Sequence, residues 1–321
     1  MIEMSRRDLI VSATATAAVF GLNGPLAFIG AAEAKVPEVG KGFFKKKLGS
    51  VDLTMLYDGS FSRPNDGSFV KNASKEDLAT ALTAAGEPAD QVVIPFTVPV
   101  VQMGGKTIFF DAGTGAQMAP TAGQMTANLQ AAGFDVAKVD MVVVTHFHPD
   151  HIFGLMAKDT NAPIFPNAEI VVPDAELAYW GDPAVIEKLP EARRGLAKRI
   201  QATLTQWKNV RRVKDGAEVA PGIRAIAAYG HTPGHTVYQI ATGGAPLMIM
   251  GDTANVPHLF VKNPGWHAVF DQDANMAETS RKAAFAKVVG DAAVMTGYHF
   301  GFPGVGTLAK DGAGFAFSPL A

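Results

Sequence analysis

The sequence of 321 residues contains no cysteine. This absence excludes thiolate metal ligands, a cysteine nucleophile and disulfide bonds, so any metal ion has to be held by histidine, aspartate and glutamate. An excess of charge of one sign is also missing, because 28 basic residues stand against 30 acidic ones and the formal net charge is -2. Without a long basic run, we expect no nucleic-acid partner and no binding to an anionic membrane, and we favour a small uncharged substrate.

The N-terminal segment is predicted to be an export signal. Ser5 to Ile10 resembles a twin-arginine consensus, and a stretch rich in apolar residues follows from Leu9 to Gly30. Gly24 and Pro25 interrupt that stretch, which weakens it as a retained membrane anchor. Ala32-Glu33-Ala34 has the small residues of a cleavage site. We therefore expect a signal peptide over residues 1–34 and a mature protein in the bacterial periplasm.

Residues 35–321 are interpreted as one domain in which strands alternate with helices, the pattern of a layered α/β protein. Gly104-Gly105 predicts a hairpin turn, and Ser74 with Asp77 resembles a helix start. No repeat of fixed period is found. Helices are expected at 124–132 and 278–289, with a helical insertion at about 174–208. Strands are expected at 51–57, 96–103, 106–110, 139–144, 168–172, 223–228, 247–250 and 292–296.

A dense group of polar side chains follows the apolar run 139–144. His146, His148, Asp150 and His151 lie within six residues, directly after a predicted buried strand. Pro149 favours the first turn of a helix, which would carry Asp150 and His151. Several imidazole and carboxylate groups this close together in the sequence, directly after the end of a strand, predict a metal site.

Further candidates follow other apolar runs. Asp252 follows the run 247–250, and His299 follows the run 292–296. The segment after 223–228 offers two histidines, His231 and His235, of which only one need bind a metal. Asp111 ends the run 106–110 and could either orient a ligand histidine or simply form a turn. His258 and His267 fit no such pattern.

Together these residues resemble the metallo-β-lactamase superfamily, a four-layer αβ/βα sandwich that holds two metal ions. The resemblance implies that Asp252 bridges the ions, that zinc is the default metal, and that a metal-bridging hydroxide is the nucleophile. Asp150 could also shuttle a proton to the leaving group. One departure is Phe153, which stands before Gly154 where the family often has two glycines. The implied ligands are His146, His148 and His235 on one ion, and Asp150, His151 and His299 on the other.

Within the superfamily, the insertion and the export signal are most similar to methyl parathion hydrolase and related lactonases. A rim of aromatic residues near the ligands, together with the lack of a basic cluster, predicts a neutral ester substrate. These residues are Phe147, Phe153, Trp180, Phe260, Trp266 and Phe270. We expect a lactone or aryl ester ahead of a phosphotriester. The alternatives are a glyoxalase II-like thioester hydrolase, a mononuclear iron enzyme and a non-catalytic periplasmic metal-binding protein. A homodimer is kept open beside a monomer.

Overall fold

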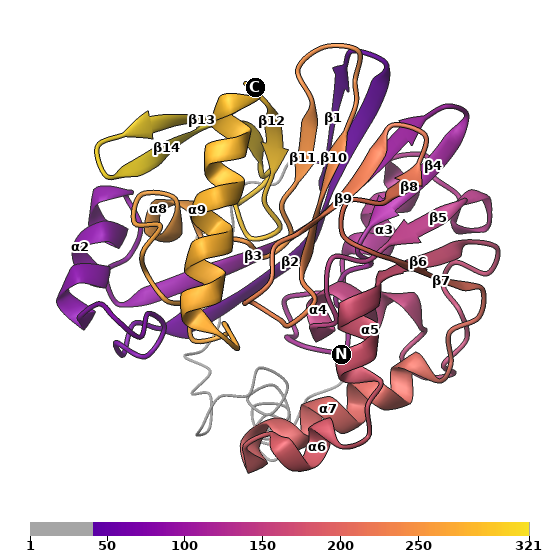
Figure 1. Cartoon of the computed structure of the whole chain (residues 1–321), viewed down its shortest axis with the longest axis horizontal. Helices are drawn as coiled ribbons and strands as arrows, with labels where there is room; N and C mark the ends of the chain where they lie inside the picture. The colour runs from indigo at the N-terminus through magenta and orange to yellow at the C-terminus, as the bar shows by residue number, and fades with distance from the viewer. Residues whose placement is uncertain (1–40, 321) are drawn as a thin grey trace, which may run out of the picture.

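Two seven-stranded sheets form the centre of the protein (Figure 1). The computed structural model describes residues 41–320, so the predicted signal peptide lies outside the described residues. The first sheet has the order β1-β2-β3-β4-β5-β6-β7, antiparallel from β1 to β4 and parallel from β4 to β7. Its strands are β1 (Phe43–Leu48), β2 (Val51–Pro64), β3 (Gln91–Met103), β4 (Lys106–Phe110), β5 (Met141–Val143), β6 (Glu169–Pro173) and β7 (Val210–Val213).

The second sheet has the order β14-β13-β12-β11-β10-β9-β8, and its one parallel pair is β11 with β12. Its strands are β8 (Glu218–Ala220), β9 (Ile223–Ala227), β10 (Thr236–Ile240), β11 (Leu247–Ile249), β12 (Val294–Thr296), β13 (Val305–Asp311) and β14 (Gly314–Pro319). The helices are α2 (Lys75–Ala84), α3 (Met125–Ala131), α4 (Pro149–Ile152), α5 (Asp174–Trp180), α6 (Val185–Lys188), α7 (Glu191–Leu204), α8 (Pro257–Phe260) and α9 (Ala274–Gly290), with short 3-10 turns at Val136–Lys138 and Phe153–Leu155.

The alternation of side chains along β5 shows how the layers are built. Met141 and Val143 belong to a core cluster shared with Tyr238 and Ile249 of the second sheet, whereas Val142 belongs to the larger cluster that includes the helices. Because successive side chains of a strand point to opposite faces, one face of each sheet packs on the other sheet and the second face packs on helices. The expected four-layer αβ/βα sandwich is confirmed. No helix within residues 41–320 is long and apolar enough to cross a membrane.

The start of α2 was predicted correctly, and its capping box joins Ser74 to Asp77. The strand predicted at 51–57 ends too early, because β2 continues through Asp58 and Gly59 to Pro64 with a register shift between Tyr57 and Gly59. The Asp58 carboxylate does not form a turn; it accepts hydrogen bonds from the backbone of Thr114 and Met125 instead. Strands β1, β7, β8, β10, β13 and β14 were not predicted.

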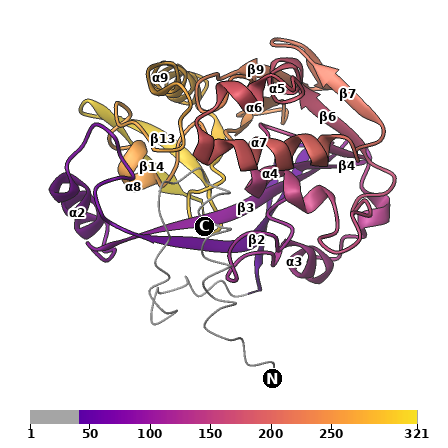
Figure 2. The same cartoon turned by 90° about the horizontal axis from the view of Figure 1, so that it is seen from below.

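The connection from β6 to β7 carries the helices of the insertion segment. Figure 2 shows α6 and α7 running across the end of the molecule where α4 also lies. Leu189, Arg193 and Leu196 from this segment line the same cavity as His148 and Asp150. The insertion therefore covers the group of residues that the sequence predicts to bind metal.

Candidate metal centre

The candidate ligands come from strand ends that meet at one edge of the two sheets. His146 follows β5, Asp252 follows β11 and His299 follows β12. Because β4 and β5 are parallel, and β11 and β12 are parallel, the loops after their carboxyl ends lie side by side. Pro149 is at the start of α4, as predicted, so Asp150 and His151 occupy its first turn.

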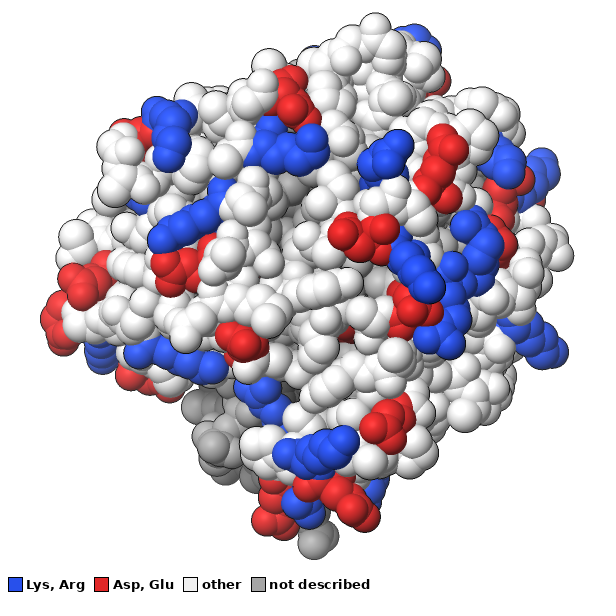
Figure 3. Space-filling model, viewed as in Figure 1, with Lys and Arg blue, Asp and Glu red and all other residues white. Residues whose placement is uncertain are grey.

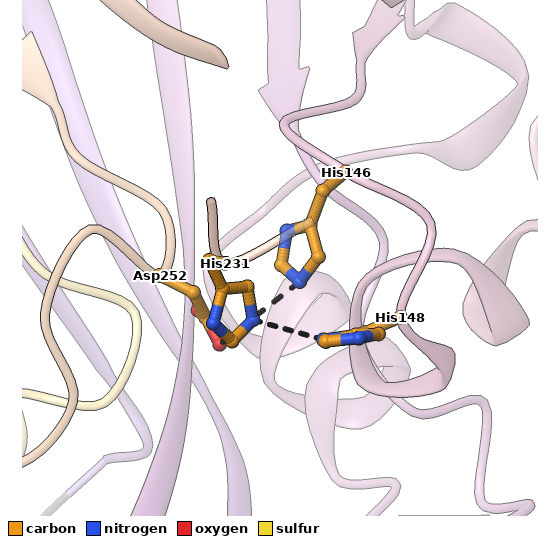
Figure 4. A group of neighbouring side chains, drawn as sticks. All are labelled: His146, His148, His231 and Asp252. Atoms are coloured by element: carbon orange, nitrogen blue, oxygen red, sulfur yellow. Dashed lines mark hydrogen bonds and ion pairs between the residues drawn. The ribbon is translucent and has the colours of Figure 1, made fainter. Parts of the chain in front are cut away.

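One group of ligand atoms comes from His146, His148, His231 and Asp252, whose donor atoms lie within 4.8 Å of one another. Figure 4 shows the three imidazoles and the carboxylate pointing toward a common centre. His231 Nε2 lies 2.9 Å from His148 Nδ1 and 3.2 Å from an Asp252 carboxylate oxygen. Three imidazoles with one carboxylate make a donor set suited to zinc and similar divalent ions.

A second group consists of Asp150, His151, Asp252 and His299, again with donor atoms within 4.8 Å of one another. His151 Nε2 lies 3.1 Å from Asp252 Oδ1, and His299 Nε2 lies 2.9 Å from Asp252 Oδ2. Asp252 is thus shared by the two groups. The structure brings six of the seven predicted ligands together in these groups.

Several of these donor atoms have no hydrogen-bond partner although they are buried. These atoms are His146 Nε2, His151 Nε2 and Asp252 Oδ1. A buried polar atom without a hydrogen bond is costly, and two metal ions, one beside His146 and one beside His151, would satisfy these atoms. The residues present therefore fit a pair of divalent ions.

The sequence analysis favoured His235 over His231 as a ligand, but the group of neighbouring donor atoms contains His231 and not His235. His235 Nδ1 faces the Ala228 carbonyl oxygen at 3.2 Å, and its Nε2 accepts the Asp252 backbone N–H at 2.9 Å. A neutral imidazole has one donor and one lone pair, and in this structure both nitrogens of His235 have protein partners. Gly251 allows this approach, because it has a φ of 49° and an added Cβ would lie 2.7 Å from His235 Nε2. In this arrangement His235 supports the Asp252 loop. His231 joins the ligand candidates, and the ligand role of His235 stays a prediction.

Each ligand histidine that turns Nε2 to the centre has a defined partner on Nδ1. The Asp111 carboxylate lies 2.8 Å from His151 Nδ1, and Asp271 lies 2.9 Å from His231 Nδ1. His299 Nδ1 lies 2.8 Å from the Pro95 carbonyl oxygen. Such partners fix the tautomer and the orientation of a ligand histidine. Of the two interpretations of Asp111, the structure therefore favours the orienting one; Asp271 was not predicted.

Glu176 was also missed by the sequence analysis. It is fully buried on α5, and Oε1 accepts hydrogen bonds from Phe147 N and Trp180 Nε1. Its Oε2 accepts from Thr232 Oγ1 and Gly234 N. One carboxylate therefore ties the loop of His146 and His148 to the loop of His231.

Charge balance in the centre depends on proton positions. Burial lowers the pKa of His146 and His148 well below the ordinary value, and burial with the charge of His231 lowers that of His235 to about 3. Burial alone would lower the pKa of His231 too, but the hydrogen bonds and charges of Asp252 and Asp271 raise it to about 9. In the metal-free protein a proton on His231 offsets carboxylate charge where a metal cation would otherwise do so.

The cavity above the ligands is mainly apolar, with a few polar groups in its walls. Of the aromatic residues predicted for the rim, Trp180 and Phe270 line the cavity, whereas Phe147, Phe153, Phe260 and Trp266 are not among its lining residues. Phe153 is buried under the Arg199 guanidinium, 4.3 Å from the ring centroid, and Phe260 packs edge-on against Phe69. These rings belong to the core. The cavity is lined by Ile94, His148, Pro149, Asp150, Trp180, Leu189, Arg193, Leu196, Asp252, Phe270, Gln272 and His299.

Residues 98–295 match the sequence model of the Metallo-beta-lactamase superfamily. This match covers more than half of the chain and agrees with the two sheets and the histidine-aspartate groups described above. The chain belongs to the metallo-beta-lactamase superfamily of metal-dependent hydrolases. A search of curated proteins found no match.

Solved structures give the same fold. The structure described as hydrolase AbOPH in the beta-lactamase superfamily has 24% identity and a TM-score of 0.81, covering 87% of this chain and 98% of that one. AidC, described as a dizinc quorum-quenching lactonase in complex with the product N-hexanoyl-L-homoserine, has 26% identity and a TM-score of 0.77, with coverage of 87% and 98%. A probable metal-dependent hydrolase from Staphylococcus aureus has 21% identity and a TM-score of 0.67, with coverage of 86% and 99%.

Proposed function

We propose that the chain is a two-metal hydrolase of neutral esters, with a lactone or an aryl ester as substrate. The observation that carries this proposal is the pair of ligand groups sharing Asp252 at the floor of a largely apolar cavity. The similarity to AidC, itself described as a dizinc lactonase, supports a lactone as the first substrate to test.

Two divalent ions held by these residues, zinc by ligand type, would supply a hydroxide nucleophile near neutral pH and stabilise negative charge that develops on the attacked ester. His146, His148 and His231 would hold one ion, and Asp150, His151 and His299 the other, with Asp252 between them. The protein residues would keep the two ligand groups at a fixed distance from each other. The hydrogen bonds from His231 to Asp271 and from His151 to Asp111 contribute to this.

Asp150 is the candidate for proton transfer to the leaving group. Its side chain lines the cavity, and Oδ2 lies 3.4 Å from His151 Nε2 and 3.5 Å from His299 Nε2. Its backbone carbonyl accepts the Tyr298 hydroxyl at 2.6 Å, which holds the first turn of α4 in place. A carboxylate at the boundary between ligand group and cavity can take a proton from the attacking oxygen and pass it to the departing alkoxide.

The cavity wall suits an uncharged organic ester. Trp180, Leu189, Leu196 and Phe270 give it apolar surface, and such surface excludes water from the reacting bond. On the face seen in Figure 3, basic and acidic side chains are interspersed rather than gathered into one basic field. This distribution supports a small substrate over a polyanion.

The test is kcat/KM of the zinc-loaded protein for N-hexanoyl homoserine lactone, dihydrocoumarin, methyl parathion and S-lactoylglutathione, with metal content measured on the same sample. We expect a lactone or aryl ester to give the highest value, and methyl parathion to follow. Fastest turnover of S-lactoylglutathione would instead identify a thioester hydrolase. Metal binding without turnover of any of these substrates would favour a metal-binding protein.

The location in the periplasm is a separate part of the proposal and rests on the twin-arginine-type segment at residues 1–34. Fractionation of cells that express the full chain tests it. We expect mature protein with a new N-terminus near residue 35 in the periplasm. Replacement of Arg6 and Arg7 by lysine should keep the precursor in the cytoplasm.

A further inference from the structure

Arg193 is a charged side chain in the cavity wall that the proposed chemistry does not use. It lies in the first turns of α7, is partly buried, and lines the cavity beside His148 and Asp252. Within the part of the chain that the structure describes, its one side-chain hydrogen bond joins Nη2 to the Val269 carbonyl oxygen at 3.4 Å. Among residues 41–320, no carboxylate lies within ion-pair distance of its guanidinium. Most of its five N–H donors are therefore available to another molecule.

Two other arginines, one fully and one partly buried, have their guanidinium groups bound by other residues of the fold. Arg281 donates to the carbonyl oxygens of three loop residues and to the Asp271 carboxylate. Arg199 stacks on the Phe153 ring and donates to Gln117 Oε1. Arg193 has no comparable set of partners within the described residues, so packing does not explain why a guanidinium occupies this position.

The surroundings of Arg193 favour an oxygen acceptor. Lys71, whose Nζ lies 3.4 Å from the Asp271 carbonyl oxygen, adds a second positive charge nearby. Arg193 Nη2 lies 3.4 Å from the Val269 carbonyl oxygen, two residues before Asp271, so the two cations contact the same short segment. Desolvation lowers the pKa of Lys71, and the charge of Arg193 lowers it further. Leu189 and Leu196 flank Arg193 on the same segment and leave its guanidinium as the strongest hydrogen-bond donor in an apolar wall.

We propose that Arg193 is a specificity-determining residue that donates hydrogen bonds to an oxygen in the non-reacting part of the substrate. The ligand groups and Arg193 line one cavity, so an ester attacked over the ligand groups would present its substituent to α7. The substrate class is a lactone or ester that carries an amide carbonyl or a carboxylate beyond the reacting bond. This inference rests on the proposed ester hydrolysis.

The experiment compares Arg193→Met and Arg193→Lys with the unaltered full chain, all loaded with zinc. The control is Lys198→Met, which removes one positive charge from the exposed side of the same helix. The substrates are N-hexanoyl homoserine lactone, a γ-butyrolactone bearing a ring carboxylate, and γ-hexalactone, which has neither group. Arg193→Met should lose about tenfold to hundredfold in kcat/KM on a lactone with the extra oxygen and less than about threefold on γ-hexalactone.

The loss should fall mainly on KM, because a contact far from the reacting bond contributes equally to substrate and transition state. Arg193→Lys should recover part of it. A larger loss on the carboxylate than on the amide would identify an anionic substrate, and the reverse a neutral one. An equal loss on all three lactones, or none on any of them, overturns the role of Arg193.

A binding measurement separates failure of this inference from failure of the proposed function. Calorimetry with N-hexanoyl-homoserine, the ring-opened acid, needs no turnover. If the unaltered protein hydrolyses no lactone, the proposed function fails, yet weaker binding of this acid by Arg193→Met than by Lys198→Met would still support an oxygen-binding role. Identical affinities for the two variants would contradict it.

Discussion

Replacement of Glu176 by glutamine tests whether one buried carboxylate holds the two histidine loops together. The carboxylate accepts two hydrogen bonds on each oxygen, from Phe147 N and Trp180 Nε1 on one side and from Thr232 Oγ1 and Gly234 N on the other. Glutamine has the same shape but offers only one acceptor oxygen. Its NH2 group would face two donors wherever it is placed.

The expected loss of stability follows from the number of hydrogen bonds that glutamine cannot replace. Two hydrogen bonds to a charged group are lost and two buried donors are left without an acceptor, at about 1–3 kcal/mol for each donor. The neutral amide is cheaper to bury than a carboxylate, since burial already raises the pKa of Glu176. We therefore expect a net loss of about 2–4 kcal/mol in the free energy of unfolding, or roughly 5–15 °C in Tm for a domain of this size.

The assay is thermal and denaturant unfolding of the zinc-loaded variant, with zinc affinity measured by chelator competition. Affinity should fall by about tenfold or more, because the loops that carry His148 and His231 lose their common anchor. Glu187→Gln is the matched control: this exposed residue on α6 should change stability by less than about 0.5 kcal/mol. Equal stability and equal zinc affinity for the two variants would refute the reasoning.

Further predictions concern the ligands. His231→Ala should lose about one equivalent of metal and nearly all activity, whereas His235→Ala should retain more metal; elemental analysis of both proteins decides which histidine is the ligand. Asp252→Ala should lose more metal and more activity than Asp111→Asn, and equal losses with full metal content would exclude a bridging role for Asp252. Zinc affinity, corrected for chelator protonation, should rise by about tenfold or more per pH unit from pH 7 to about 9, because binding displaces the protons of His231, whose pKa is raised to about 9, and of His151, whose pKa is raised well above its ordinary value. Stability of the metal-free protein should change with the opposite sign, since a histidine with a folded pKa above its ordinary 6.5 stabilises below that pH and loses this contribution as pH rises to about 9.

Much of the site could be predicted because the strands that deliver ligands are short apolar runs with a polar residue directly after them. Met141–Val143 and Val294–Thr296 are such runs, and His146 and His299 follow them. Once a chain alternates strands with helices, residues after parallel strands meet at one edge. This rule needs no knowledge of the loops themselves, which is why it succeeded for most of the ligand set.

The choice between His231 and His235 could not be made from residue types. Both follow β9 within eight residues, and both stand beside a threonine or glycine. What separates them is the direction of one lone pair: His235 Nε2 is occupied by the Asp252 backbone N–H, which comes from a loop 17 residues further along the chain. A contact of that kind has no local sequence signal.

The prediction of an aromatic rim was wrong at several positions for a related reason. Phenylalanine near a ligand in sequence is as well suited to the core as to a cavity, and Phe153 and Phe260 are both core residues. Arg193 could not be predicted either, because a single guanidinium in the cavity wall leaves no basic cluster in the sequence. Only the fold places it there, on a helix that lies over the ligands.

The residues that orient the ligands are the least predictable part of the centre, and they connect its halves. Glu176 follows β6 of the first sheet and binds the loop before β10 of the second. Asp271 precedes α9 and holds His231, while Arg281 of α9 holds Asp271. A carboxylate in such a place looks like any surface acid in the sequence, since only the fold buries it and supplies its donors. Displacement of one sheet relative to the other would break the hydrogen bonds of Glu176 to Thr232 and Gly234, so the ligand geometry depends on the packing of both sheets together.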